Sequence, residues 1–139
     1  MEYTMITYST DHTITTAEFI QILIDSTLAE RRPIDDTERM KKMVENASII
    51  VTAWDKDRLV GVARSISDFA YWTYLADLAV HVKYQKRGIG CELIRVTREV
   101  TGNDVIILVI AAPAAIDYYQ HIGFQNMDRI WILPPAERI

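Results

Sequence analysis

A short glycine-containing loop is the part of the sequence whose residue types and spacing best fit a chemical role. Residues 85–90 read QKRGIG and lie between a predicted strand and a predicted helix. Amide groups at a helix N-terminus have no partner within the helix, and the helix dipole makes that end positive. Gly88 and Gly90 let an anion approach the backbone because they have no Cβ. With charge added by Lys86 and Arg87, this loop predicts a cradle for a pyrophosphate group.

Two other phosphate-binding motifs do not match this loop. A Walker A loop requires Gly-Lys-Ser/Thr, but Gly90 is followed by Cys91 and Glu92. A dinucleotide-binding loop requires a third glycine at the position where Leu93 stands. The loop is therefore neither a Walker A loop nor a dinucleotide-binding loop, and its glycine spacing belongs to another kind of phosphate-binding loop.

The charge of the chain is acidic on average but positive around this loop. The net charge is −4, whereas residues 81–101 carry +3 by themselves. An acidic chain is a poor partner for DNA or RNA over a broad surface. We therefore expect no nucleic-acid partner, and the local positive charge fits a single phosphate-bearing ligand.

Composition narrows the remaining classes of protein. A single cysteine, Cys91, excludes an internal disulfide, and the three histidines lack metal-ligand spacing, so we expect no metal. No Lys or Arg precedes Arg31, and the longest apolar stretch, residues 105–116, is too short to span a bilayer. The sequence thus predicts a cytoplasmic protein with no membrane partner.

The 139 residues are expected to form one domain, 1–139, of mixed α+β class. Apolar periodicity and turn residues predict strands over 3–8, 48–54, 59–66, 72–81 and 105–110, with a last strand segment beginning at Gly123. Helices are predicted over 16–29, from Asp35 to about 47, over 88–100, and from Pro113 to about 121. One βαβ crossover then places two parallel strands in a mostly antiparallel sheet.

Two blocks of this sequence resemble the GNAT superfamily of N-acetyltransferases. Residues 75–94 read as an apolar strand, a short loop with the glycine spacing Q/R-x-x-G-x-G/A, and an amphipathic helix. Residues 111–124 resemble the family's aromatic-Tyr-x-x-x-Gly-Phe motif, with Tyr118 where Phe is commoner. The order of elements is also that of the family.

The resemblance implies a fold and a cofactor site. It implies helices on both faces of the sheet and parallel strands four and five that splay apart around acetyl-CoA beyond a bulge. On this sequence the resemblance places the strand-four backbone that pairs with the cofactor at Leu78, Ala79 and Val80. It also implies that the Val80 N–H faces the thioester oxygen and stabilises the tetrahedral oxyanion formed there. The pyrophosphate is held by the amides of Gln85, Lys86, Arg87, Gly88, Ile89 and Gly90.

The resemblance also implies a general acid, and it leaves the general base open. Tyr119 corresponds to the residue that protonates the leaving thiolate, whereas Tyr118 is expected to point elsewhere on its helix. The family's usual glutamate position holds Tyr74. Asp77 and Asp68 are alternatives, although strand alternation is expected to place Asp77 on the opposite face from Tyr74 and Val80. Water is the default base.

The implied activity is transfer of acetyl to a primary amine of a small molecule or peptide, with Tyr119 as acid. Candidate acceptor-binding residues are Arg31, Arg32, Tyr74 and Asp77. The alternative is a non-catalytic acyl-CoA-binding module on the same fold. Members of this family often dimerise, and residues 130–133 offer an apolar edge for a homodimer.

Overall fold

A five-stranded mixed sheet forms the centre of the protein, which a computed structural model describes over residues 5–136. Its strands are β1 (Ile6–Ser9), β2 (Ile49–Asp55), β3 (Arg58–Ser67), β4 (Trp72–Val80) and β5 (Ile106–Val109), adjacent in that order. All neighbouring pairs are antiparallel except β4 and β5, which are parallel. The parallel pair follows from the crossover through α3 (Ile89–Thr101) between these two strands.

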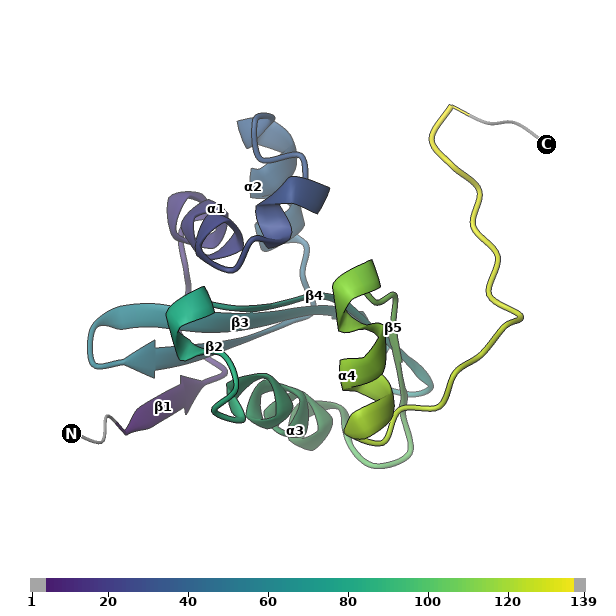
Figure 1. The fold of residues 1–139 in the computed structure, drawn as a ribbon. Helices are drawn as coiled ribbons and strands as arrows, with labels where there is room; N and C mark the ends of the chain where they lie inside the picture. The colour runs from purple at the N-terminus through teal and green to yellow at the C-terminus, as the bar shows by residue number, and fades with distance from the viewer. Residues whose placement is uncertain (1–4, 137–139) are drawn as a thin grey trace.

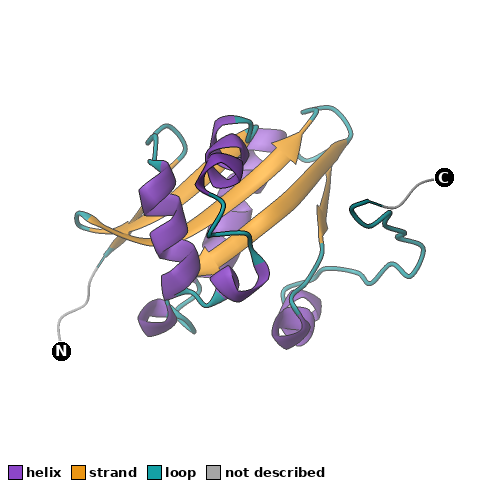
Figure 2. Ribbon diagram, turned by 90° about the horizontal axis from the view of Figure 1, so that it is seen from above, coloured by secondary structure: helices purple, strands orange, loops and turns teal. Residues whose placement is uncertain are grey.

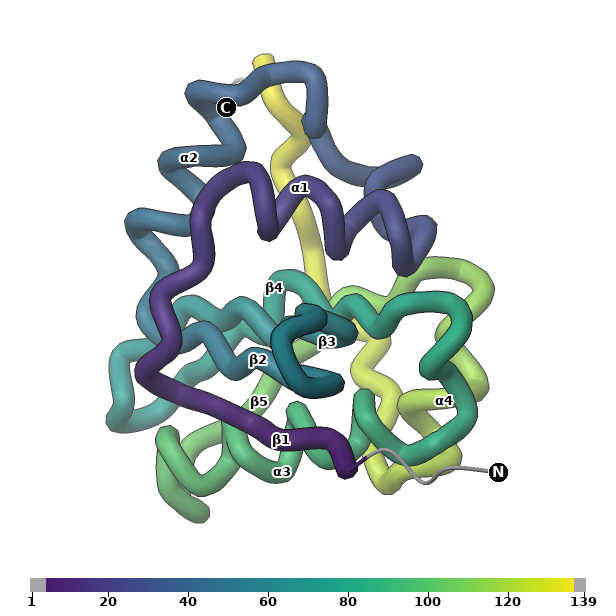
Figure 3. The backbone as a smooth tube through the Cα atoms, turned by 90° about the vertical axis from the view of Figure 1, so that its left-hand side faces the viewer, coloured from purple at the N-terminus to yellow at the C-terminus, as the bar shows by residue number. Residues whose placement is uncertain are grey.

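Helices cover both faces of this sheet, as Figures 1 and 3 show. α1 (Thr16–Asp25) and α2 (Thr37–Glu45) lie on one face, where Phe19, Leu23 and Met40 are fully buried against strand residues such as Val62. α3 lies on the other face and buries Leu93 against β2 and β3, with α4 (Ile116–His121) near β5. The predicted α+β class and the parallel strand pair are confirmed.

The first helix is shorter than the sequence predicts. Its start is the predicted capping box, in which Thr15 and Glu18 bond each other's backbone amides. Its end is at Asp25 rather than residue 29, because the Ser26 hydroxyl bonds local backbone groups and Thr27 adopts a left-handed φ of 72°. The chain then forms a short 3-10 helix, η1 (Leu28–Arg31), which brings Arg31 and Arg32 over the sheet.

Other boundaries differ by a few residues. β1 begins at Ile6, and residues 3 and 4 of the predicted first strand lie outside the described residues. The β2–β3 turn holds two residues rather than four, because Lys56 adopts a left-handed φ of 54°. β4 is followed by a 3-10 helix, η2 (Val82–Tyr84), and Pro113 opens a further one, η3 (Pro113–Ala115), before α4.

The predicted last strand is wrong. Residues 122–136 contain no helix or strand and pair with no strand of the sheet, and Figure 2 shows them as an extended loop beyond β5. The strand-forming run Ile130–Leu133 is bounded by Asp128-Arg129 and by Pro134-Pro135, and prolines have no amide to donate to a ladder. Its side chains are exposed, Trp131 by 89%. Among the described residues, β5 is therefore an edge strand.

Candidate active site

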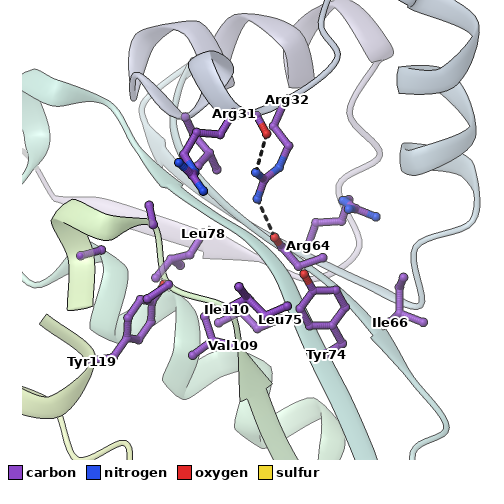
Figure 4. A pocket seen from close by; sticks show the side chains of 15 residues that line it. Arg31, Arg32, Arg64, Ile66, Tyr74, Leu75, Leu78, Val109, Ile110 and Tyr119 are labelled. Carbon is purple, nitrogen blue, oxygen red and sulfur yellow. Dashed lines mark hydrogen bonds between the residues drawn. The ribbon is translucent and has the colours of Figure 1, made fainter. Parts of the chain in front are cut away.

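A cavity of about 240 Å³ lies where β4 and β5 separate (Figure 4). The β4–β5 pairing ends at Leu75 and Val109, whereas β4 continues to Val80. The predicted splay of these two strands is therefore present. The lining residues come from η1 and its flanks, β3, β4, β5 and the segment up to α4: Leu28, Arg31, Arg32, Arg64, Ile66, Tyr74, Leu75, Ala76, Leu78, Val109, Ile110, Ala111, Ala112, Ala115 and Tyr119.

A β-bulge at Ala76 lies at the point of separation. In the β3–β4 register, Asp77 pairs with Arg64 and Leu75 pairs with the next residue, Ser65, so Ala76 is the extra residue on β4. A bulge bends its strand and interrupts the alternation of side chains between the two faces. The bulge therefore accounts for the end of the β4–β5 ladder and for the change of face that follows it.

This change of face corrects the predicted orientation of Asp77. Directly paired residues point to the same face, so Tyr74 lies with its partner Ile66, and Asp77 lies with its partner Arg64. Arg64 and Ile66 are two residues apart on β3 with no bulge of β3 between them, so all four side chains share one face. It is the face that α1 and α2 cover, because the Arg64 guanidinium lies over the Phe19 ring of α1. Asp77 is thus on the same face as Tyr74, because the parity rule assumed a regular strand.

Asp77 is buried and bound by two arginines. One carboxylate oxygen accepts from Nε of Arg32 and the other from Nε of Arg64. Arg32 also donates to the carbonyl oxygen of the bulge residue Ala76, at 2.9 Å. These contacts join η1, β3 and β4 around the bulge. They give Asp77 a structural role, and the carboxylate does not line the cavity.

Arg64 is the site residue that the sequence analysis missed. Its side chain is 8% exposed and its guanidinium carbon lies 6.0 Å from the centre of the Phe19 ring. The available signal was that Arg64 is the single charged residue of the predicted strand 59–66. A cation at such a position is rarely buried without an acidic partner, and here that partner is Asp77.

The backbone of β4 beyond the bulge presents an open edge toward the cavity side. The His81 amide donates to the Val60 carbonyl on β3, at 2.9 Å. Because backbone groups alternate in direction along a strand, those of Leu78 and Val80 point away from β3, and those of Ala79 point toward it. The Val80 carbonyl accepts from the side chain of Gln85, at 2.9 Å. Leu78 and Val80 are therefore placed for a further hydrogen-bonding partner on this edge.

The glycine loop ends at the N-terminus of α3, as predicted. Lys86 and Gly88 have left-handed φ values of 65° and 81°, and Gly88 is the N-cap. Lys86 and Arg87 are exposed, and Arg87 lies 5.1 Å from the centre of the Tyr84 ring. The side chain of Ile89 is buried in the core. The loop thus offers exposed cations and helix-start amides, while Ile89 anchors it.

Tyr118 and Tyr119 point in different directions, as the helical spacing predicts. Their ring planes are inclined by 79°. The Tyr118 hydroxyl lies against Gly90, where an added Cβ would approach it to 2.8 Å. Tyr119 instead lines the cavity, packed edge-on against Phe124. The glycine at position 90 therefore leaves room between α3 and α4.

Burial raises the pKa of Tyr119 to about 12. The nearby Tyr118 adds a smaller part of this increase in pKa, and the positive charge of Arg32 opposes it. The phenol consequently keeps its proton throughout the neutral range. Figure 4 places it across the cavity from Arg31 and Arg32, with Tyr74 and Arg64 at the far end.

Asp68 organises the turn between β3 and β4. Its carboxylate accepts the amides of Ala70, Tyr71 and Trp72 at 2.8–3.1 Å. These bonds, led by that from Tyr71, hold the pKa of Asp68 below its usual range. Neither Asp68 nor Asp77 lines the cavity.

The residues around the cavity and the loop fit acetyl-CoA. The loop has the exposed cations and the left-handed N-cap glycine of a phosphate cradle, and the open β4 edge offers backbone groups to an amide-bearing arm. Among residues 5–136, no three His, Cys, Asp or Glu side chains gather as a metal site. No helix in this part of the chain has the length and apolarity needed to cross a membrane.

Comparison with known proteins agrees with this geometry. The sequence model of the acetyltransferase (GNAT) domain family matches residues 24–131. An uncharacterised ycf52-like N-acetyltransferase of Prochlorococcus marinus is 32% identical over 96% of this chain and 71% of its own length. A ycf52 N-acetyltransferase of Gracilaria tenuistipitata var. liui is 28% identical over 76% of this chain, which spans 59% of that relative.

Solved structures share the fold. A probable acetyltransferase from methicillin-resistant Staphylococcus aureus has a TM-score of 0.77 at 24% identity, covering 94% of this chain and all of that one. The aminoglycoside N-acetyltransferase AAC(6′)-Iy in complex with CoA has a TM-score of 0.73 at 12% identity, covering 97% of each chain.

Fold and site together thus match an acyltransferase in which the parallel strands β4 and β5 separate beside the cavity. The chain belongs to the GNAT family of acetyltransferases, whose members use acetyl-CoA.

Proposed function

We propose that this chain transfers the acetyl group of acetyl-CoA to a primary amine of a small molecule or peptide by direct attack. The observation that carries the proposal is the cavity at the β4–β5 separation, which Tyr119 and Leu78 both line. In this reaction the amine nitrogen forms a bond to the acetyl carbon and the carbon–sulfur bond breaks. The amine loses one proton, and the leaving sulfur gains one.

The open edge of β4 and the glycine loop would hold the two ends of acetyl-CoA. We assign the Val80 amide to the thioester oxygen, because the alternation of β4 directs it away from β3. A preorganised backbone donor at such an oxygen contributes about 3 kcal/mol in other acyl-transfer enzymes. Lys86, Arg87 and the amides around Gly88 would bind the pyrophosphate.

Tyr119 is the proposed proton donor to the sulfur. Its pKa of about 12 keeps the phenol protonated at neutral pH, which a general acid requires. An unperturbed thiol has a pKa of about 8.5 and is the stronger acid, so complete proton transfer from the phenol is uphill even to the fully formed thiolate, and the phenol first stabilises the departing sulfur as a hydrogen-bond donor. The hydrogen bond from Tyr119 therefore acts chiefly in the transition state.

Water is the proposed acceptor of the amine proton. The cavity lining contains no Asp or Glu, the oxygens of Asp77 bind two arginines, and Asp68 caps a turn. The supply of neutral amine then limits the rate at low pH. We expect the rate with a saturating amine to rise with pH as that amine deprotonates.

The test is release of free thiol from acetyl-CoA across a broad amine panel, with mass detection of the acetylated product. Wild-type turnover with Tyr119→Phe reduced at least about a hundredfold supports the proposal. Tyr71→Phe is the matched control, because Tyr71 is 56% exposed at the β3–β4 turn and does not line the cavity. Thermal protection by acetyl-CoA without thiol release from any amine would identify a binding module instead.

A further inference from the structure

The charge of the cavity is opposite to the average charge of the chain. Three arginines, Arg31, Arg32 and Arg64, line it, and no acidic side chain does. Asp77, bound beneath Arg32 and Arg64, compensates one of the three charges. The site therefore keeps a formal charge of +2 in a chain whose net charge is −4.

Two of these arginines are held by protein groups. Arg32 donates from Nε to Asp77, and from its two terminal nitrogens to the carbonyls of Arg31 and Ala76 at 2.8 and 2.9 Å. Arg64 donates to Asp77 and to the Met43 carbonyl. Their positions are therefore set by the fold, and they give the cavity a fixed positive field.

Arg31 is different, because its guanidinium has no hydrogen-bond or ion-pair partner among residues 5–136, although its backbone carbonyl is held by Arg32. It ends η1, and Figure 4 shows its side chain reaching from the helix side toward the part of the cavity near Leu78. A planar guanidinium in this position offers a two-pronged donor to an incoming anion.

We propose that the acceptor is a small amine that also carries a carboxylate, and that Arg31 binds this carboxylate. This inference rests on the proposed function, since it names the acceptor of the same site. The carboxylate would pair with Arg31 in the field of Arg32 and Arg64, leaving the amine free to face the Tyr119 side of the cavity. A polycationic acceptor would instead meet a site with a formal charge of +2, which is strongly unfavourable.

The size of the cavity agrees with an amino acid. Its volume of about 240 Å³ is below the roughly 300–1,000 Å³ of pockets for drug-sized ligands, which favours a small acceptor. Ile66, Tyr74 and Ile110 add apolar surface beside the arginines. A free amino acid with an aliphatic side chain fits both the small volume and the lining of arginines beside apolar side chains.

The experiment compares each of a set of free amino acids, leucine among them, with its own carboxamide. The two members of a pair have the same side chain and the same amine position. The neighbouring carboxylate raises the pKa of the amine, so intrinsic reactivity at pH 8 favours the carboxamide. A kcat/KM at least about tenfold higher for the free acid than for its amide is therefore expected only if the carboxylate is bound.

Variants assign the effect to Arg31. Arg31→Gln should raise KM for the free acid about tenfold or more, leave KM for the amide and for acetyl-CoA unchanged, and thus abolish the preference. Arg31→Lys should restore part of it, because Lys keeps the charge but lacks the planar fork. The matched control is Arg39→Gln, an exposed arginine of α2 that does not line the cavity.

A second readout needs no turnover. Calorimetric titration of the protein with CoA present compares N-acetylleucine with N-acetylleucinamide, and the acid should bind more tightly in wild type but not in Arg31→Gln. Turnover without a preference for the acid overturns this inference and leaves the proposed function standing. Without turnover, the titration decides: preferential binding of the acid supports the Arg31 site, and equal or undetectable binding overturns it.

Discussion

Tyr119 acquires its properties from its neighbours rather than from its residue type. Burial beside Tyr118 and Phe124 raises the pKa of the phenol, and the guanidinium of Arg32 opposes this increase. Only one residue away, Tyr118 points to the start of α3 and is 37% exposed. Two adjacent and identical side chains thus have different surroundings, and only Tyr119 lines the cavity.

The raised pKa makes a prediction about alkaline stability. The unfolded-state pKa of Tyr is about 10, and that of folded Tyr119 is about 12. The corresponding contribution to the free energy of unfolding is fully present below pH 10 and is lost as the pH rises through 12. Urea unfolding of wild type and Tyr119→Phe at pH 8 and pH 11 should show a smaller alkaline loss in the variant. Equal losses would contradict the raised pKa.

Gly88 should be needed for both the backbone and the cofactor. Its φ of 81° is left-handed, so Gly88→Ala is expected to cost about 1–2 kcal/mol of stability. Gly102, at the other end of the same helix, has a φ of 92° and likewise open space around it. Gly102→Ala should destabilise at least as much, but only Gly88→Ala should weaken acetyl-CoA binding in calorimetry. Equal affinities in the two variants would remove this loop from the cofactor site.

At the scale of elements, one buried ion cluster joins three segments that are distant in sequence. Arg32 follows η1, Arg64 is on β3 and Asp77 is on β4 just after the bulge. Because Arg32 also binds the Ala76 carbonyl, the cluster supports the strand distortion that ends the β4–β5 ladder. Loss of the cluster should therefore affect both stability and the shape of the cavity.

Asp77→Ala tests this cluster. Removal of the carboxylate leaves Arg64 buried without its partner, which typically costs about 3–5 kcal/mol. At about 3 °C for each kcal/mol in a chain of this size, the melting temperature should fall by roughly 10 °C. Glu45→Ala, whose single ion pair with Lys41 is exposed, should change it by less than about 2 °C. Similar effects of the two substitutions would contradict the proposed role of the cluster.

The sequence predicted those parts of the site that depend on local order along the chain. The QKRGIG loop lies between a strand and a helix, and Tyr119 lies in the aromatic-Tyr-x-x-x-Gly-Phe motif. Both were therefore identified from short stretches of sequence, without tertiary information. The bulge at Ala76 and the pairing of Asp77 with Arg64 depend on strand register, and no local pattern encodes them. The predicted C-terminal strand is absent because an apolar run becomes a strand only when its backbone pairs with an edge strand of the sheet.

At the scale of the whole molecule, the described residues divide into a packed body and an extended C-terminal segment (Figure 1). α1, α2 and α3 bury the two faces of the sheet, whereas Ile130 to Leu133 are 40–89% exposed. Residues 128–136 form no hydrogen bond with another part of residues 5–136. The body therefore draws little of its stability from this segment.

A chain that ends at Met127 should consequently keep the stability of the full chain. We expect the melting temperature to change by less than about 2 °C, because exposed segments without such contacts contribute within about 0.5 kcal/mol. A chain that ends at Gly123 should behave differently, since it also lacks Phe124, whose ring packs 5.3 Å from that of Tyr119. This shorter chain should lose both stability and the pKa shift of Tyr119, measured by the ultraviolet absorbance of tyrosinate between pH 9 and 12. A large loss of stability in the chain that ends at Met127 would mean that residues 128–136 stabilise the edge of β5 in solution.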